Sequence, residues 1–283
     1  MKNLTRREAV KSAGVAGAML LGGPAVWASL PEGAAIAASR CAKLTPELTE
    51  GPYWVNTMLR RCDVRANSHG GRRQAGVPLK LYINVLNASR HCRPLSGVAV
   101  DIWHANAHGL YSDETSQQAG GGTTGGDTSS DNWLRGYQIT GQDRGLAHKP
   151  VAGQVSFRTI WPGWYTGRAI HIHVRVRHLS HGGATIAGYT TQIFFTDAAN
   201  DHVLTAATPY NARSPQTDPT TDENDTVLST ADVTTNVVGV HGSIAHGYTA
   251  TFNIAATAAE VSATGSLARP TTGGQTGGPP PSA

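Results

Sequence analysis

Apolar and polar residues alternate with a period of two in six segments that are rich in Val, Ile, Thr and aromatic residues. Clusters of Gly, Pro, Asn and Asp separate these segments. Alternation with this period is typical of strands that bury one face. The pattern predicts an all-β fold, a single antiparallel β-sandwich domain with long loops, between about residues 45 and 256. The expected strands are residues 77–86, 97–103, 154–160, 170–177, 188–195 and 248–254.

Helical periodicity is weak outside the first 37 residues, and only residues 229–238 suggest a helix. Two stretches have low complexity. Residues 119–130 (AGGGTTGGDTSS) are predicted to form a flexible surface loop, and residues 270–283 (PTTGGQTGGPPPSA) a disordered tail.

The first 37 residues have the order of an export signal. Lys2, Arg6, Arg7 and Lys11 precede an uncharged run over 12–28, and small residues suited to cleavage follow. The run is too short and too rich in Ala and Gly for a membrane span, so no stable membrane anchor is expected after its removal. The residues around Arg6 and Arg7 resemble a twin-arginine signal. We therefore expect export to the periplasm or the medium by a route that carries folded proteins.

The charge distribution argues against a nucleic-acid partner. Half of the net charge of +4 lies in the first 37 residues, and the remaining cations form no cluster interleaved with aromatic residues. Cys41, Cys62 and Cys92 permit one intramolecular disulfide at most, and the sequence leaves the pairing open. No CxxC element is present, which argues against a structural zinc site.

The densest group of chemically versatile residues is 162–174 (PGWYTGRAIHIHV). On a strand, His171 and His173 project from the same face, where two imidazoles suit a metal. Tyr165 lies in a Pro/Gly turn shortly before them, Arg168 lies between, and a second tyrosine, Tyr111, lies near the end of 100–112 (VDIWHANAHGLYS). Each of these residues taken alone also has an ordinary structural interpretation, as a surface histidine, a turn aromatic or a solvated cation.

Taken together, several ordered stretches resemble the intradiol ring-cleaving dioxygenases, above all their protocatechuate 3,4-dioxygenase-like branch. The stretches are 45–55 (TPELTEGPYWV), 92–112 (CRPLSGVAVDIWHANAHGLYS), 134–140 (LRGYQIT), 155–174 (VSFRTIWPGWYTGRAIHIHV) and 191–195 (TQIFF). The resemblance implies a non-haem Fe(III) cofactor that cleaves a catechol-type substrate with O2, between its two hydroxyl-bearing carbons, to a muconate-type diacid.

The resemblance also implies the residues of the site. Tyr111, Tyr165, His171 and His173 match the four iron ligands, with Tyr165 as the one that the substrate displaces. Arg168 matches a residue that stabilises negative charge on the substrate ring, and Gln192 a polar residue of the same pocket. Hard phenolate oxygens favour Fe(III), and binding to the metal offsets the cost of deprotonating a phenol whose pKa is ordinarily near 10.

Two features depart from the better-known members of this family. The spacing between Tyr165 and His171 is compact, and the Gly-rich residues 119–130 follow Tyr111 closely, where they would border the mouth of the site. Because both features lie where the substrate would enter, the sequence does not indicate which ring substituent the substrate carries. The chain also lacks the long helical N-terminal region of the catechol 1,2-dioxygenases, so the sequence gives no oligomeric state.

Two alternatives stay open. One is an exported β-sandwich module that binds a catechol or a siderophore without turnover, and the other is a copper or zinc enzyme on the same residues. Two phenols and the absence of a nearby thiolate favour iron. Other residues are expected to be structural: His104 as a core histidine or one that supports a ligand, His241 and His246 in a turn, and Trp54, Trp103 and Trp164 in the core or the pocket wall.

Overall fold

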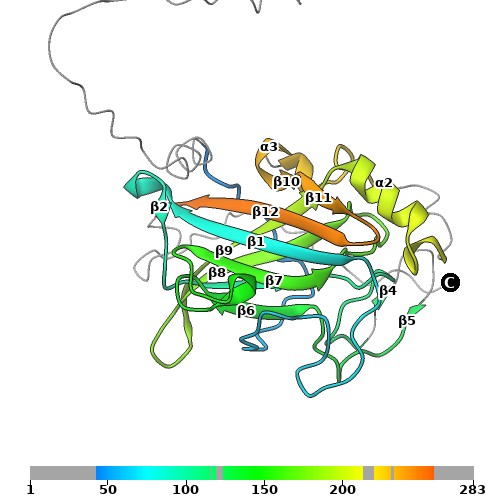
Figure 1. Ribbon diagram of the computed structural model, residues 1–283, viewed down its shortest axis with the longest axis horizontal. Helices are drawn as coiled ribbons and strands as arrows, with labels where there is room; N and C mark the ends of the chain where they lie inside the picture. Colours follow the sequence, from blue (N-terminus) through cyan, green and yellow to red (C-terminus); the bar gives the residue numbers. More distant parts are fainter. Residues whose placement is uncertain (1–42, 116, 119–123, 213–219, 231–232, 258–283) are drawn as a thin grey trace, which may run out of the picture. The chain divides into compact units, whose positions relative to one another are not determined.

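The computed structural model describes residues 43–115, 117–118, 124–212, 220–230 and 233–257 (Figure 1). The predicted export signal and the predicted tail lie outside these residues, and so do residues 119–123 of the Gly-rich stretch.

Two five-stranded sheets make up most of the described structure. The first sheet has the order β11-β12-β1-β2, with β7 also paired to β1, and the second has the order β10-β9-β8-β3-β6. A separate two-stranded ribbon consists of β4 (Gln117–Gln118) and β5 (Thr124–Gly125). The first sheet is built from β1 (Pro78–Asn87), β2 (Arg93–Pro94), β7 (Gln154–Ile160), β11 (Val240–Ser243) and β12 (Gly247–Ala256). The second is built from β3 (Ala99–Trp103), β6 (Arg135–Ile139), β8 (His171–Leu179), β9 (Thr185–Phe195) and β10 (Val237–Val238).

The prediction of an all-β sandwich is confirmed, and its six expected strands correspond to β1, β3, β7, β8, β9 and β12. The antiparallel description needs a correction for two strand pairs. β1 runs parallel to β12, with Leu79 opposite Tyr248, and β10 runs parallel to β9. Alternation shows which face of a strand is buried but carries no information on the direction of its neighbour, so the sequence pattern could not reveal this.

One ten-residue helix, α2 (Asp197–Ala206), was not expected. Its N-cap is Thr196, whose side chain accepts a hydrogen bond from the backbone N–H of Ala199. Only Asn200 and Val203 are buried in it, so it shows no apolar stripe. The stretch 229–238 is not one helix, since it contains part of a 3-10 turn, the short α3 (Val233–Asn236) and β10. That 3-10 turn is Leu228–Thr230, and the others in the described residues are Ala88–Arg90, Gly145–Ala147 and Tyr210–Ala212.

The main core lies between the two sheets, where β1 and β12 lie over β8 and β9 (Figure 1). Ile172, Val174 and Val176 of β8 belong to this core together with alternate residues of β1. The period of two therefore turns His171 and His173 to the other face of the second sheet. That face is covered as well, because Leu48 and Leu228 pack there against Phe194 and Ala169.

Cys92 is disulfide-bonded, and Cys62 is free, with its thiol 3.3 Å from the Ser156 carbonyl oxygen. The third cysteine lies outside the described residues. In the part of the chain that the structure covers, no helix combines the length and the apolar character needed to cross a membrane.

Candidate metal centre

Two buried histidines of β8 form the base of the centre. His171 and His173 are each almost completely shielded from solvent, and their Nε2 atoms lie 3.0 Å apart. Burial lowers the pKa of His171 to about 3, helped by the nearby charge of Arg168. Burial and the proximity of His171 lower the pKa of His173 well below its usual range. Both rings are therefore neutral at physiological pH, which is the form that binds a metal.

The tautomer of His171 is fixed by the backbone. Its Nδ1 lies 2.6 Å from the carbonyl oxygen of Ala169, and because a carbonyl can only accept, Nδ1 carries the proton. The Nε2 of the neutral ring then presents its lone pair toward His173 and the tyrosines. A hydrogen bond on the opposite ring nitrogen is the usual way in which proteins orient a metal-binding histidine.

Two phenols complete the group. The hydroxyl oxygen of Tyr165 lies 3.1 Å from the Nε2 of His171, and that of Tyr111 lies 3.4 Å from the same atom. Tyr111 is buried after β3, whereas Tyr165 is half-buried in the turn before β8, where Gly167 adopts a positive φ of 85°. Burial raises the pKa of both phenols, for Tyr111 well above its ordinary value, while the charge of Arg168 counteracts the rise at Tyr165.

The structure thus brings together all four side chains that the sequence suggested as ligands, and their spacing fits a single metal ion. Two donor atoms bound about 2.0–2.2 Å from one ion, at angles near 90–110°, lie roughly 3.0–3.5 Å apart. The separations of 3.0, 3.1 and 3.4 Å around the Nε2 of His171 fall in this range. Among the described residues, no group of three or more His, Cys, Asp or Glu side chains could hold a metal.

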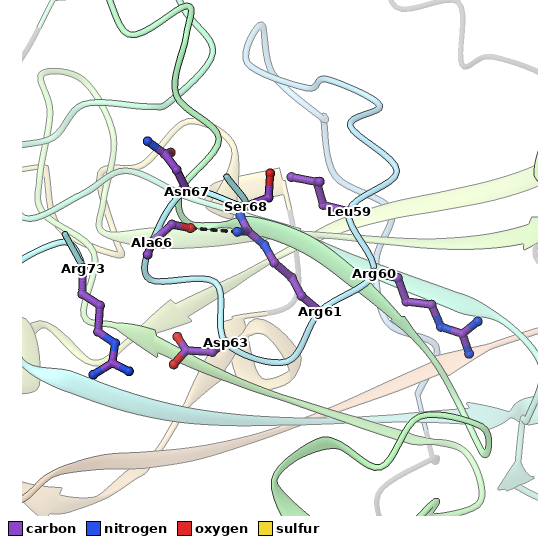
Figure 2. A pocket seen from close by; sticks show the side chains of 8 residues that line it. All are labelled: Leu59, Arg60, Arg61, Asp63, Ala66, Asn67, Ser68 and Arg73. Carbon is purple, nitrogen blue, oxygen red and sulfur yellow. Dashed lines mark hydrogen bonds between the residues drawn. The ribbon is translucent and has the colours of Figure 1, made fainter. Parts of the chain in front are cut away.

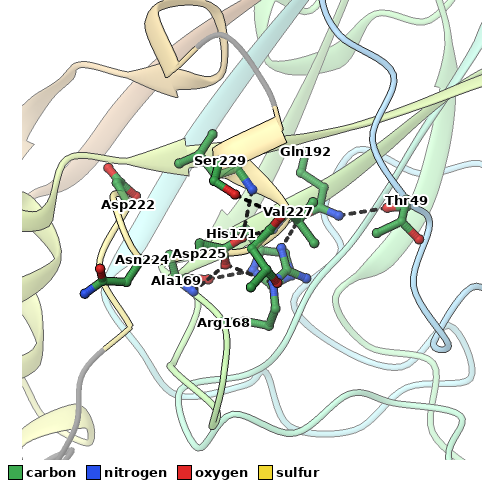
Figure 3. Close-up of polar contacts among 12 residues, drawn as sticks. Thr49, Arg168, Ala169, His171, Gln192, Asp222, Asn224, Asp225, Val227 and Ser229 are labelled. Carbon is green, nitrogen blue, oxygen red and sulfur yellow. Dashed lines mark hydrogen bonds and ion pairs between the residues drawn. The ribbon is translucent and has the colours of Figure 1, made fainter. Parts of the chain in front are cut away.

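Arg168 and Gln192 lie next to the histidine pair, as the sequence suggested. Gln192 stands opposite His173 in the β8–β9 pairing. Its side-chain oxygen accepts a 2.5 Å hydrogen bond from Arg168 Nη2, and its amide nitrogen donates to the Thr49 carbonyl at 2.7 Å. Figure 3 shows Arg168 between Gln192 and an acidic residue, Asp225.

Asp225 is a residue of this site that the sequence did not reveal. Its fully buried carboxylate accepts hydrogen bonds from Arg168 Nε at 2.9 Å and from the Ala169 N–H at 2.7 Å. Burial alone would raise the pKa of Asp225, but Arg168 and the N–H of Leu228 outweigh burial and lower it. Asp225 follows Arg168 at a long sequence distance and in irregular structure, so no local pattern indicates the contact.

Aromatic rings enclose two of the four side chains. Trp103 stacks on His173 with ring centroids 4.7 Å apart and planes 8° apart, and Tyr53 stacks on Tyr111 at 4.4 Å. Trp54 lies against Trp103 at 4.7 Å. Trp54 and Trp103 thus form a wall beside His173, whereas Trp164 belongs to the main core.

Structural roles are expected for three other histidines, His104, His241 and His246. His104 is buried, with its ring nitrogens 2.8 Å from the Ala105 carbonyl oxygen and 2.7 Å from the Thr159 hydroxyl. His241 lies in β11 and His246 in the turn between β11 and β12, where His246 Nδ1 lies 3.2 Å from the Ser243 hydroxyl.

The backbone of Tyr111 is held by the segment that follows it. The side-chain amide of Gln117 accepts from the Tyr111 N–H and donates to the Tyr111 carbonyl, both at 2.6 Å. The buried hydroxyl of Thr128 donates to the same carbonyl at 2.8 Å. The described end of the predicted flexible loop is therefore ordered against a candidate ligand, which corrects that part of the prediction.

A separate cleft of about 450 Å³ lies away from these residues. Two of its cations are engaged within the protein, since Arg60 pairs with Asp143, and Arg61 donates to the Ala66 and Arg135 carbonyls. None of its lining residues belongs to the candidate centre. Figure 2 shows these residues: Leu59, Arg60, Arg61, Asp63, Ala66, Asn67, Ser68 and Arg73.

The fold is thus a β-sandwich in which two tyrosines from loops meet two histidines of β8. Residues 49–238, roughly two thirds of the chain, match the family model described as dioxygenase. The chain therefore belongs to this dioxygenase family, which confirms the resemblance to the intradiol ring-cleaving dioxygenases.

Solved structures with a similar fold include the intradiol ring-cleavage dioxygenase from Tetranychus urticae. It is 24% identical, with a TM-score of 0.61 over 78% of this chain and 97% of that chain. The dioxygenase domain of a dioxygenase–carbohydrate-binding fusion protein from Streptomyces sp. SirexAA-E is 26% identical, with a TM-score of 0.48 over 76% and 99%. The shared fold rests on the first of these. A search of curated proteins finds no significant match.

Proposed function

We propose that this protein is a non-haem Fe(III)-dependent intradiol dioxygenase. It would open a catechol-type ring between the two hydroxyl-bearing carbons with O2 and release a muconate-type diacid. The observation that supports this most directly is the convergence of the His173 imidazole and two phenols within 3.0–3.4 Å of the Nε2 of the neutral His171 ring. Membership of the dioxygenase family agrees with it.

Tyr111, Tyr165, His171 and His173 would hold the iron. Bound Fe(III) supplies a Lewis acid that lowers the pKa of phenols and catechols and withdraws electron density from the substrate ring. The free phenols have raised pKa values, so both tyrosines are protonated before the metal binds.

Tyr165 is suited to exchange with the substrate. It is the more exposed of the two tyrosines and lies in a turn, whereas Tyr111 is buried and its backbone is held by Gln117. The phenol oxygen of Tyr165 can then take a proton from a catechol hydroxyl. The Tyr111 side chain, by contrast, stays in place through its stacking on Tyr53.

Arg168 contributes a fixed positive charge. Its guanidinium donates to Asp225 and Gln192, and its charge lowers the pKa of both histidines of the centre. A cation held in this way stabilises negative charge that develops on a bound aromatic ring, and burial strengthens the effect because water is excluded.

The colour of the purified, iron-loaded protein tests the proposal. Tyrosinate bound to Fe(III) should give a broad visible absorption band that shifts when catechol is added without O2. On admission of O2, one equivalent should be consumed per muconate-type diacid formed, as followed by an oxygen electrode and ultraviolet absorbance. A coloured protein that consumes no O2 with catechol, protocatechuate or hydroxyquinol would indicate a binding module instead. A colourless protein that retains zinc would contradict the iron assignment.

Substitution of the ligands tests the assignment of residues. Tyr165→Phe should shift the visible band and His173→Ala should weaken iron binding by at least about 100-fold, more than is typical for residues that only orient a ligand. Matched controls are Tyr82→Phe on β1 and His178→Ala, further along β8, which should keep the iron and the band. Normal iron content and colour in both ligand variants would refute the assignment.

A further inference from the structure

We propose that Asp225 is a positioning residue that organises one whole side of the centre. Through one carboxylate it would hold Arg168 beside the substrate and, through the backbone of Ala169, keep His171 in its metal-binding tautomer. The expected effect of Asp225 on kcat rests on the proposed function. Its consequence for His171 can be measured without metal or turnover.

The carboxylate uses its two oxygens for two different tasks. Oδ2 accepts from Arg168 Nε at 2.9 Å and from the Ala169 N–H at 2.7 Å. Oδ1 accepts from the N–H groups of Val227 and Leu228, both at 2.9 Å. The first oxygen thus holds the turn that leads into β8, and the second holds the carboxylate to its own segment (Figure 3).

Ala169 connects Asp225 with His171. Its N–H donates to Asp225, and its carbonyl accepts the Nδ1 proton of His171 at 2.6 Å. Ala169 is buried among Leu48, Phe194 and Leu228, so its backbone has little room to turn. Asp225 therefore helps to fix the acceptor that determines which nitrogen of His171 carries the proton.

Asp225 also determines the direction of the Arg168 guanidinium. Two of the five guanidinium N–H groups are engaged, one by Asp225 and one by Gln192 from β9. These two acceptors come from different segments, so they hold the plane of the group from two sides. An arginine held in this way loses less freedom when a substrate binds.

The hydrogen-bond inventory explains why a carboxylate is needed here. Four N–H donors point at Asp225, and a carboxylate can accept from all of them. Asparagine has a single acceptor oxygen, so in either orientation its NH2 group would face two N–H donors. A buried charge that makes these four bonds is stabilised, whereas removal of a partner leaves the others unsatisfied.

The alternative is that Asp225 merely caps the turn at Leu228–Thr230 through its bonds to Val227 and Leu228. Asp225→Asn separates the two roles when it is compared with Asp222→Asn, which makes the same chemical change in the same segment. Asp222 makes no hydrogen bond or ion pair with Arg168 among the described contacts, and burial raises its pKa to about 7, so the amide should be tolerated there.

The first measurement uses metal-free protein. The 15N chemical shifts of the His171 ring should show the Nδ1–H tautomer in the wild type and in Asp222→Asn, and a mixture of tautomers in Asp225→Asn. Iron affinity should then fall by about 10–100-fold in Asp225→Asn, the range typical of residues that orient a ligand. Unchanged shifts and iron affinity in a folded Asp225→Asn would overturn the proposal.

The second measurement is a double-mutant cycle with Arg168→Gln. Arg168→Gln should lower kcat while leaving iron affinity within about threefold of the wild type. Because Asp225 would act on turnover through Arg168, adding Asp225→Asn should lower kcat no further, whereas its loss of iron affinity should persist. Additive losses in kcat would contradict the positioning role.

If Asp225→Asn does not fold, Asp225→Glu keeps the charge but moves the carboxylate, and the same changes are expected in smaller degree. A folded Asp225→Glu with wild-type shifts, iron affinity and kcat would overturn the proposal. A wild-type protein that turns over no catechol would count against the proposed function only, because the tautomer comparison would still test Asp225.

Discussion

The two histidines of the centre are oriented in different ways. His171 is oriented by a hydrogen bond to Ala169, but the Nδ1 of His173 is buried without a hydrogen-bond partner among the described residues. Its ring is instead held by packing, with Trp103 stacked on one side. Gly51 also lies close, since a β-carbon there would come within 3.3 Å of the His173 Cε1 atom. Packing thus takes the place of the usual hydrogen bond.

This difference makes Trp103 a test of ligand orientation. Trp103→Leu should weaken iron binding about tenfold or more because it removes the flat surface, whereas Trp103→Phe, which keeps a ring, should stay within about threefold. Iron affinity can be measured by competition with a chelator.

Trp161→Leu is the matched control, because Trp161 is equally buried but packs on Phe195 and Tyr248 in the main core. It should lower stability without changing iron affinity. The interpretation fails if Trp103→Leu binds iron normally or if both leucine variants lose it equally.

The site residues that could be predicted from the sequence are those that lie in short, recognisable stretches. Tyr165, Arg168, His171 and His173 lie in one short stretch, and Tyr111 lies in a second recognisable stretch. Asp225 and the stacking surface of Trp103 depend on contacts between segments distant in the sequence, which no single stretch encodes. The metal ligation itself and the predicted twin-arginine export remain predictions.

Strand β8 contributes residues both to the main core and to the candidate metal centre. Its inward residues Ile172 and Val174 belong to the main core, and the alternate residues are the two histidines. Tyr111 has no such anchor, because it follows β3 outside any strand. Gln117, at the start of β4, supplies the missing backbone partner by pairing with both its N–H and its carbonyl.

Gln117→Ala should therefore act on Tyr111. We expect a loss of about 1–3 kcal/mol in the free energy of unfolding, because a buried N–H is left unsatisfied, together with a shift of the visible band of the iron-loaded protein. Urea unfolding and absorbance would measure the two effects. Gln142→Ala, at an exposed position, should change neither. A stable Gln117→Ala variant with an unchanged band would contradict the role assigned to Gln117.

At the level of elements, the period of two located the long strands but not their partners. The burial pattern of β1 follows the alternation, with Leu79, Leu81 and Ile83 inside. The parallel pairing with β12 depends on the path of the chain, which alternation does not record. Helix α2 was missed because its buried face includes the polar Asn200, whose side chain bonds to Trp161 and Phe195.

Across the whole molecule, the N-terminal arm joins both sheets. The N–H of Thr45 donates to Ala255 of β12 at 2.9 Å, and the N–H of Leu48 donates to Thr190 of β9 at 2.8 Å. The same arm leads to Gly51 and Tyr53, which lie against the centre. The enclosure of the centre therefore depends on the sandwich being fully assembled.

The stability of the assembled protein should depend on pH through His104. Burial lowers the pKa of His104 to about 4, whereas an unfolded chain has a value near 6.5. Unfolding therefore takes up a proton between these values, so stability is complete above pH 6.5 and falls as the pH drops toward 4. From pH 7.5 to pH 5 this histidine should account for a loss of about 2 kcal/mol.

Urea unfolding of the metal-free wild type and His104→Gln at both pH values would measure this contribution. The wild type should lose about 2 kcal/mol more than His104→Gln, since the contributions of His171 and His173 cancel in the comparison. His178→Gln, at a half-exposed position, should follow the wild type. Equal losses in the wild type and His104→Gln would refute the assignment.

The parallel pairing of β1 with β12 has a consequence for biosynthesis. β1 lies in the middle of its sheet, and its partner along nearly its whole length is the last strand of the described chain, with Leu79 opposite Tyr248 and Asn87 opposite Ala256. A nascent chain on the ribosome can pair β1 with β2 and β7, but the other edge of β1 has no partner until residue 256 has left the exit tunnel. Until then this sheet lacks β12, so the sandwich can be completed only after residue 256 has been translated.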